Sequence, residues 1–175
     1  MFANVAVCLT LVLGGARSGK SRYAENLIAA LPPPWLYVAT AQALDAEMTE
    51  RIAVHRARRG SGWTTIEAPH DVAGALSAHA RMPTLVDCLT LWLSNLMLAK
   101  ADIGAEIEVI ESALTKRTAP TVLVANEVGF GIVPDNALAR RFRDQQGLLN
   151  QRIAAQADRV VLMVAGLPVH VKGVP

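Results

Sequence analysis

The feature of this sequence that most constrains its fold is the glycine-rich segment GGARSGKS at residues 14–21. It fits the pattern GxxxxGK[ST], follows the apolar run Val5–Leu13 and precedes a helix-like segment that begins at Ser21. In this strand–loop–helix setting, backbone N–H groups and the amino end of the helix can surround phosphate oxygens. The sequence therefore predicts a phosphate-binding loop (P-loop) in an α/β domain. The alternative is a chance glycine turn before a helix.

The loop residues have separate expected roles. Lys20 is placed to reach the β and γ phosphate oxygens, and the Ser21 hydroxyl to bind Mg²⁺. A strand that ends in a carboxylate, Thr84 to Asp87, offers Asp87 as a second Mg²⁺ ligand, although Asp87 could instead cap the helix that follows. The predicted phosphate-binding set is Gly14, Gly15, Ala16, Arg17, Ser18, Gly19, Lys20 and Ser21.

Short β-branched runs alternate with helical stretches along the whole sequence. This alternation predicts a three-layer α/β fold with a mostly parallel central sheet and ligands at the carboxyl ends of its strands. At 175 residues the chain has the size of one domain, so we expect residues 1–175 to form a single nucleotide-binding domain. The predicted strands are Val5–Leu13, Trp35–Thr40, Trp63–Glu67, Thr84–Cys88, Pro120–Asn126 and Arg159–Ala165, the last of these ending the sheet. The predicted helices are headed by Ser21, Leu44, Asp71, Leu91, Ala105 and Pro134.

The composition argues against several classes of protein. An apolar fraction of 52% with 18% charged residues fits strands that are buried on both faces, and a net charge of +2 does not predict binding to nucleic acid. Cys8 and Cys88 lie far apart in apolar runs, so we expect reduced buried thiols and no zinc site. No apolar run reaches the roughly 20 residues of a membrane span, and no signal peptide is recognisable, which predicts a cytoplasmic protein.

One predicted helix combines a histidine with a basic face. Leu44, Met48 and Ile52 recur at helical spacing, and a second stripe holds Arg51, His55, Arg58 and Arg59. Nearby arginines disfavour protonation of an imidazole, so His55 would stay neutral and could attack a phosphorus atom. The alternative is a solvated basic helix that carries an ordinary histidine. The other histidines, His70, His79 and His170, have no charged cluster around them.

The sequence resembles the bifunctional adenosylcobinamide kinase and adenosylcobinamide-phosphate guanylyltransferase family over Leu11 to Pro168. The resemblance lies in the segments GGARSGKSRYAE, YVATAQALDAEM, RIAVHRARRG, LVDCLTLWLSNL and NEVGFGIVPDNALARRFRDQQGLLNQRIA. The last segment is the most distinctive, with Asn126 to Gly129, Gly131 to Pro134 and the later Arg140, Phe142, Arg143 and Asp144.

The resemblance implies two reactions. ATP or GTP phosphorylates the aminopropanol hydroxyl of adenosylcobinamide, and GTP then donates GMP, through a guanylyl-histidine, to give adenosylcobinamide-GDP. It implies Mg²⁺ held by Ser21 and Asp87, catalysis by His55 and Lys20, and a homotrimer with sites between subunits. Val54 precedes His55, so this chain has one histidine where some relatives have two. The implied nucleotide site adds Ala39, Thr40, Ala41, Arg56, Ala57, Arg58, Arg59, Glu67 and Asp87 to the P-loop residues.

The residues themselves leave two other functions open. A P-loop kinase for a small molecule would need no nucleotidyl transfer and would leave His55 a bystander. A non-catalytic GTP-binding module would bind without turnover, although the NKxD-like motif that such proteins use to recognise guanine is absent from the sequence. Two positions have less defined roles: some relatives have serine at Ala41, so that hydrogen bond would be missing here, and Glu127 could contact a ligand or make a structural hydrogen bond.

Overall fold

The computed structural model describes residues 9–43 and 45–173, which form seven strands and six helices. The strands are β1 (Leu9–Gly14), β2 (Trp35–Ala39), β3 (Trp63–Glu67), β4 (Thr84–Asp87), β5 (Thr121–Asn126), β6 (Arg159–Val164) and β7 (Leu167–Lys172). The helices are α1 (Lys20–Ala29), α2 (Ala46–Arg58), α3 (Val72–Ala78), α4 (Leu89–Leu98), α5 (Ile103–Thr115) and α6 (Ala137–Gln156).

All described strands belong to one sheet in the order β3-β2-β4-β5-β1-β6-β7. The pairs among β1 to β6 are parallel, and β7 pairs antiparallel with β6. The prediction of a mostly parallel sheet is therefore confirmed. Because β1 lies between β5 and β6, its carboxyl end opens near the middle of the sheet edge, where the predicted phosphate loop begins.

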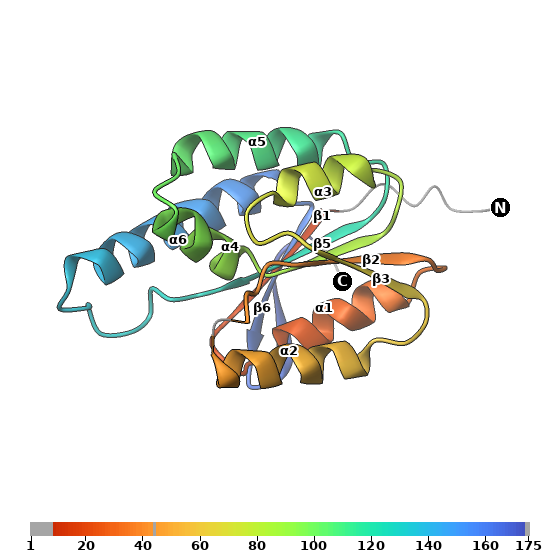
Figure 1. The fold of residues 1–175 in the computed structure, drawn as a ribbon, viewed down its shortest axis with the longest axis horizontal. Helices are drawn as coiled ribbons and strands as arrows, with labels where there is room; N and C mark the ends of the chain where they lie inside the picture. The colour runs from red at the N-terminus through yellow and green to blue at the C-terminus, as the bar shows by residue number, and fades with distance from the viewer. Residues whose placement is uncertain (1–8, 44, 174–175) are drawn as a thin grey trace.

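Helices cover both faces of the sheet, as Figure 1 shows: α1 and α2 lie on one face and α3 to α6 on the other. Two apolar clusters fill these two layers. One lies between the sheet and α1, and a larger one lies between the sheet and helices α3 to α6. In β5 the two clusters take alternate residues, with Val122 and Val124 on one face and Leu123 and Ala125 on the other. A strand that is buried on both faces has no polar alternation, which explains the continuous apolar run in the sequence.

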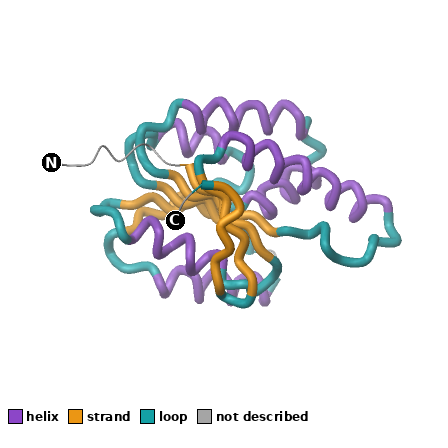
Figure 2. Tube along the Cα trace, turned by 180° about the vertical axis from the view of Figure 1, so that it is seen from behind, coloured by secondary structure: helices purple, strands orange, loops and turns teal. Residues whose placement is uncertain are grey.

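The antiparallel strand β7 was not predicted, and ending the sheet with Arg159–Ala165 was wrong. Ala165 and Gly166 have φ of 52° and 82°, so both central residues of the turn are left-handed, as in the tight hairpins that suit twisted strands. All six residues of β7 are exposed, and its proline is typical of an edge strand. Figure 2 shows β6 and β7 as a hairpin at the edge of the sheet. A short, exposed, proline-containing strand has little of the apolar signal from which strands are predicted.

Side-chain caps set where several helices begin. Asp45, Asp71 and Asn136 each accept a hydrogen bond from a backbone N–H three residues later, which satisfies a donor at the amino end of α2, α3 and α6. The helices predicted from Leu44 and Pro134 therefore begin later, at Ala46 and Ala137. Leu44 itself lies outside the described residues.

Of the two cysteines, the structure describes Cys88. Cys88 is a buried free thiol, and burial, with a smaller effect of Asp87, raises its pKa to about 12. The thiol is therefore protonated at neutral pH, while Cys8 lies outside the described residues. No helix in the described part of the chain combines the length and apolar character needed to cross a membrane.

Candidate functional site

The predicted phosphate loop turns tightly between β1 and α1. Gly19 stands at the amino end of α1 with a φ of 92°, a left-handed conformation that favours glycine. The Ser18 N–H donates to the Gly15 carbonyl at 3.3 Å, and Lys20 Nζ donates to the same carbonyl at 2.9 Å. No side chain caps α1, so its first N–H groups are not satisfied by a capping residue. This end of the helix is built to receive an anion.

Two neighbouring segments brace the loop from behind. The Gly166 N–H, in the turn of the β6–β7 hairpin, donates to the Ser18 carbonyl at 3.1 Å. The Glu127 N–H, just after β5, donates to the Gly14 carbonyl at 3.1 Å. The loop carbonyls at residues 14, 15 and 18 thus have partners within the protein. Their satisfaction fixes the loop conformation before any ligand binds.

The Ser18 hydroxyl differs from these carbonyls. Its oxygen is buried and has no hydrogen-bond partner among the described residues. A buried hydroxyl without a partner costs roughly 1–3 kcal/mol. Such a group in a phosphate loop is a donor that a bound phosphate oxygen can satisfy.

Asp87 lies at the carboxyl end of β4, separated from the P-loop strand β1 by β5 alone. Its Oδ2 accepts a hydrogen bond from the Tyr37 hydroxyl at 3.1 Å. The alternative that Asp87 caps the following helix does not describe this chain. The cap position of α4 is Cys88, and α4 has no side-chain cap hydrogen bond.

Thr40 fastens the end of β2 to the end of β4. Its hydroxyl donates to the Cys88 carbonyl at 2.7 Å and accepts from the Cys88 N–H at 2.8 Å. The Thr40 carbonyl accepts from Asn95 Nδ2 at 2.9 Å. Thr40 is fully buried, so its side chain holds the ends of β2 and β4 together and is not itself exposed to a ligand. Its neighbours Ala39 and Ala41 are partly exposed.

The basic helix is α2, and it contains His55 at the position that the sequence predicts. The side chains of His55, Arg51 and Arg58 lie outside the described set. Arg56 Nη2 pairs with Glu67 Oε1 at 2.6 Å, and both side chains are more than half exposed. An exposed ion pair contributes about 0–1 kcal/mol, so a ligand could exchange with it at low cost. Ala57 is exposed, and the Arg59 guanidinium lies over the Tyr37 ring, 3.6 Å from its centroid.

The segment after β5 begins at the P-loop and leads away from it. Glu127 Oε1 accepts from the Gly129 N–H at 2.8 Å, so this carboxylate makes the structural hydrogen bond that the sequence left open. Farther along, Phe130, Ile132, Val133 and Leu138 are exposed. Figure 1 shows this segment and the first turns of α6 extending past the edge of the sheet.

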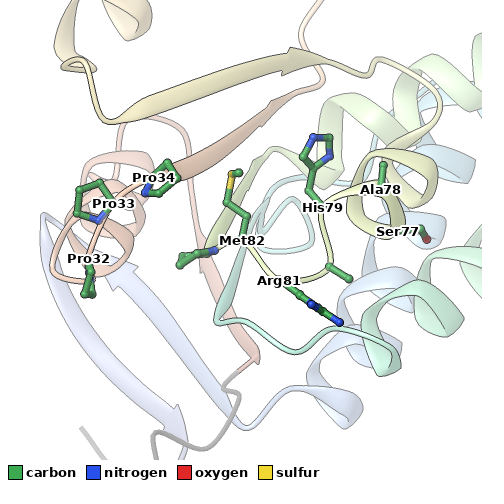
Figure 3. Close-up of a pocket in the computed structure, with 10 residues that line it drawn as sticks. Pro32, Pro33, Pro34, Ser77, Ala78, His79, Arg81 and Met82 are labelled. Atoms are coloured by element: carbon green, nitrogen blue, oxygen red, sulfur yellow. The ribbon is translucent and has the colours of Figure 1, made fainter.

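A depression lies at the opposite, amino edge of the sheet. Pro32 to Pro34 line it on one side, and residues 77–83, from the last turn of α3 to the residue before β4, line it on the other (Figure 3). Figure 3 shows the Met82 side chain between the prolines and His79. The depression has no glycine loop, so the phosphate-binding features identify the carboxyl edge as the candidate site.

Comparison with known proteins agrees with this geometry. Residues 10–171 match the family described as "Cobinamide kinase / cobinamide phosphate guanyltransferase". The chain belongs to this family. It is 48% identical over 169 residues to the bifunctional adenosylcobalamin biosynthesis protein CobP of Pseudomonas aeruginosa, covering 94% of this chain and 98% of that protein. It is 42% identical over 181 residues to the CobU protein of Salmonella typhimurium, covering 94% and 99%.

These matches confirm the family that the sequence resembles and its paired activity. The chain is a bifunctional cobinamide kinase and cobinamide phosphate guanylyltransferase of adenosylcobalamin biosynthesis. Solved structures add likeness of fold alone. The flagellar accessory protein FlaH of Methanocaldococcus jannaschii superposes with a TM-score of 0.53 at 12% identity, covering 96% of this chain and 79% of that one.

The fold brings the P-loop, Ala39, Glu67 and Asp87 to the carboxyl edge of the sheet, but two contributors were missed. Tyr37 and Gly166 contact Asp87 and the P-loop from segments that carried no motif. A buried tyrosine needs a partner for its hydroxyl, which was the available signal for Tyr37. Gly166 belongs to the hairpin that was itself not predicted.

Proposed function

We propose that this enzyme carries out guanylyl transfer through His55, at a site that is shared with its kinase reaction and formed by the P-loop, Asp87 and α2. The observation that carries the proposal is the P-loop, with its uncapped helix end and a buried Ser18 hydroxyl that has no partner among the described residues. The helix that contains His55, α2, lies on the same face of the sheet as α1. The proposed substrates are adenosylcobinamide, with ATP or GTP as phosphoryl donor and GTP as the source of GMP.

The proposed metal is Mg²⁺, held by the Ser21 hydroxyl and the Asp87 carboxylate. These oxygen donors fit Mg²⁺, which uses one or two protein oxygens together with substrate phosphates and water. A cluster of three or more His, Cys, Asp or Glu side chains suited to a metal is absent among the described residues. When bound, Mg²⁺ supplies positive charge to the phosphate oxygens.

In the kinase step, the P-loop N–H groups and Lys20 hold the triphosphate so that the γ-phosphorus faces the substrate hydroxyl. The hydroxyl oxygen forms a bond to the γ-phosphorus and releases its proton to solvent, and the bond from the γ-phosphorus to the β–γ bridging oxygen breaks. A nucleoside diphosphate leaves with the cleaved bond's electron pair. Lys20 stabilises charge on the departing group.

In the transfer step, neutral His55 attacks the α-phosphorus of GTP. The new N–P bond forms as the bond to the α–β bridging oxygen breaks, and pyrophosphate leaves. A phosphate oxygen of the acceptor then attacks the same phosphorus, the N–P bond breaks, and the imidazole returns to its neutral form. Glu67 is the proposed acceptor for guanine N–H groups. The guanine would replace Arg56 as the partner of the Glu67 carboxylate.

A labelling experiment tests His55. Wild type and His55→Ala are incubated with Mg²⁺ and GTP labelled on the α-phosphate, denatured, and treated with acid and with alkali. We expect an acid-labile, alkali-stable label in wild type that is lost in the variant, while phosphorylation of cobinamide by γ-labelled nucleotide persists. His170→Ala, in β7, is the matched control. Label that survives in His55→Ala would assign the intermediate to another residue.

We also propose a cytoplasmic homotrimer. Exposed Phe130, Ile132 and Val133, in the segment after β5, support an association surface, because large exposed apolar clusters commonly mark interfaces. Light scattering coupled to size-exclusion chromatography tests the assembly. A monomeric mass for the active enzyme would reject it.

A further inference from the structure

Tyr37 lies between two parts of the proposed site. It is in the middle of β2, is 4% exposed, and faces the same side of the sheet as α1. On the neighbouring strand, Leu85 is its register partner and Asp87 follows two residues later, so all three side chains share one face. This register lets the Tyr37 hydroxyl reach Asp87 Oδ2 at 3.1 Å.

Tyr37 also contacts Arg59, the C-cap residue that follows α2. The guanidinium carbon lies 3.6 Å from the ring centroid, a close cation–π contact. Trp63 meets the same ring edge-on at 6.1 Å, and Trp35 lies 5.3 Å from Trp63. The aromatic side chains of β2 and β3 thus form a fixed platform beneath Arg59.

The platform contributes to the anchorage of α2. None of the α2 side chains that the structure describes is fully buried. Two arginine contacts join its carboxyl-terminal end to the strands: the exposed pair of Arg56 with Glu67, and Arg59 on Tyr37. The Nη1 atom of Arg59 is buried without a hydrogen-bond partner among the described residues. The contact that the structure describes for this guanidinium is its packing on the Tyr37 ring.

The Tyr37 hydroxyl donates its hydrogen bond to Asp87, because a carboxylate oxygen can only accept. Such a bond leaves the other carboxylate oxygen free to turn toward a ligand.

We propose that Tyr37 is a positioning residue that joins the two chemistries of this enzyme: its hydroxyl orients Asp87 toward the metal–nucleotide complex, and its ring holds Arg59 and so the end of the helix that carries His55. The inference rests on the proposed roles of Asp87 and His55. It assigns to one side chain two separable effects, one on metal affinity and one on guanylyl transfer.

Three substitutions separate these effects. Tyr37→Phe keeps the ring and removes the hydroxyl, Arg59→Gln keeps length and removes the charge above the ring, and Tyr37→Leu removes both functions. Tyr23→Phe, the only other tyrosine of the chain, is the matched control. Metal affinity is measured without turnover, as Mn²⁺ binding to enzyme saturated with a GTP analogue whose α–β bridge is methylene. The rate of histidine labelling and the rate of cobinamide phosphorylation are measured at saturating Mg²⁺.

Tyr37→Phe should weaken Mn²⁺ binding about tenfold, the size expected for loss of a hydrogen bond to a metal ligand, and leave labelling at saturating Mg²⁺ near wild type. Arg59→Gln should slow histidine labelling more than phosphorylation, with Mn²⁺ affinity kept, and Tyr37→Leu should show both defects. A Tyr37→Phe enzyme with unchanged Mn²⁺ affinity, or an Arg59→Gln enzyme that slows both reactions equally, would overturn the inference.

Asp87→Asn distinguishes failure of this inference from failure of the proposed function. If Asp87→Asn weakens Mn²⁺ binding and Tyr37→Phe does not, Asp87 keeps its role and Tyr37 loses the one proposed here. If Asp87→Asn leaves Mn²⁺ binding unchanged, the metal role of Asp87 is wrong.

Discussion

The two edges of the sheet handle buried polar groups in opposite ways. At the amino edge, the guanidinium of Arg117 is buried and donates to Leu76, His79 and Met82 carbonyls and to the hydroxyls of Thr84 and Thr121. At the carboxyl edge, the Ser18 hydroxyl is buried without a partner among the described residues. Arg117 finds its acceptors within the chain, whereas the P-loop leaves a hydroxyl donor for a ligand.

Stability and ligand binding therefore depend on different edges of the sheet. Arg117 fastens the end of α3 to the first residues of β4 and β5, and burial lowers its pKa to about 10, so it keeps its charge at neutral pH. Because a buried cation is costly unless it is hydrogen-bonded, loss of these acceptors would destabilise the folded protein. The carboxyl edge instead carries the unsatisfied Ser18 hydroxyl in a loop whose carbonyls are held by the N–H groups of Gly166 and Glu127.

The largest expected effect is at Arg117. Arg117→Met keeps much of the side-chain volume but leaves carbonyl and hydroxyl groups without their donor, and should lower the free energy of unfolding by about 4 kcal/mol. Urea denaturation followed by circular dichroism measures it. Nucleotide affinity of the remaining folded enzyme should stay near wild type, and a large loss of affinity would break the contrast between the two edges.

The next effect is at Lys20. Lys20→Met keeps the aliphatic stem and removes the charge, and both reactions should slow by about 100-fold or more, equivalent to roughly 2.7 kcal/mol of transition-state stabilisation. Stability should change by no more than about 1 kcal/mol. Rates with γ-labelled and α-labelled GTP, beside a thermal melt, test this. A Lys20→Met variant that is much less stable, yet keeps the wild-type rates when folded, would show that Lys20 has a structural role like that of Arg117.

A smaller effect is expected at Gly166, which links the hairpin to the P-loop. Its φ of 82° strains any side chain, so Gly166→Ala should cost about 1–2 kcal/mol of stability. Because its N–H holds the Ser18 carbonyl, GTP affinity should fall as well. Calorimetric titration measures the affinity, and Gly131→Ala, where added volume meets open space, is the control. Equal affinity in both variants would show that the hairpin does not support the loop.

The smallest effect appears only in alkali. The folded pKa of Cys88, about 12, lies above its ordinary value of 9.0, so the folded state keeps a proton that the unfolded chain releases. Stability from this group is complete below pH 9 and is lost as pH rises from 9 to 12. Cys88→Ala should reduce the slope of unfolding free energy against pH in this window by at most one proton, as measured by urea titrations. Tyr37, whose pKa burial also raises, contributes above pH 10 in both proteins.

The sequence could predict what is encoded locally. The P-loop, the strand ending at Asp87 and the helix containing His55 are each recognisable within a dozen residues, and the structure brings the first two to one edge. Arg117 could not be recognised as a structural centre, because its five acceptors come from positions 76 to 121 and depend on how α3, β4 and β5 meet. The contact of Tyr37 with Asp87 likewise depends on the pairing of β2 with β4, which no local pattern specifies.

The brace between Gly166 and the P-loop has a consequence for the order in which a ribosome releases the chain. β1 and the P-loop emerge early, but β1 pairs with β5 and β6, which emerge later. The Ser18 carbonyl cannot accept its hydrogen bond until the N–H of Gly166 has emerged. A nascent chain that holds all of the P-loop motif therefore still lacks the support behind it until the final hairpin has emerged. Competence to bind nucleotide should arrive late and abruptly during synthesis, which keeps half-made chains from sequestering GTP.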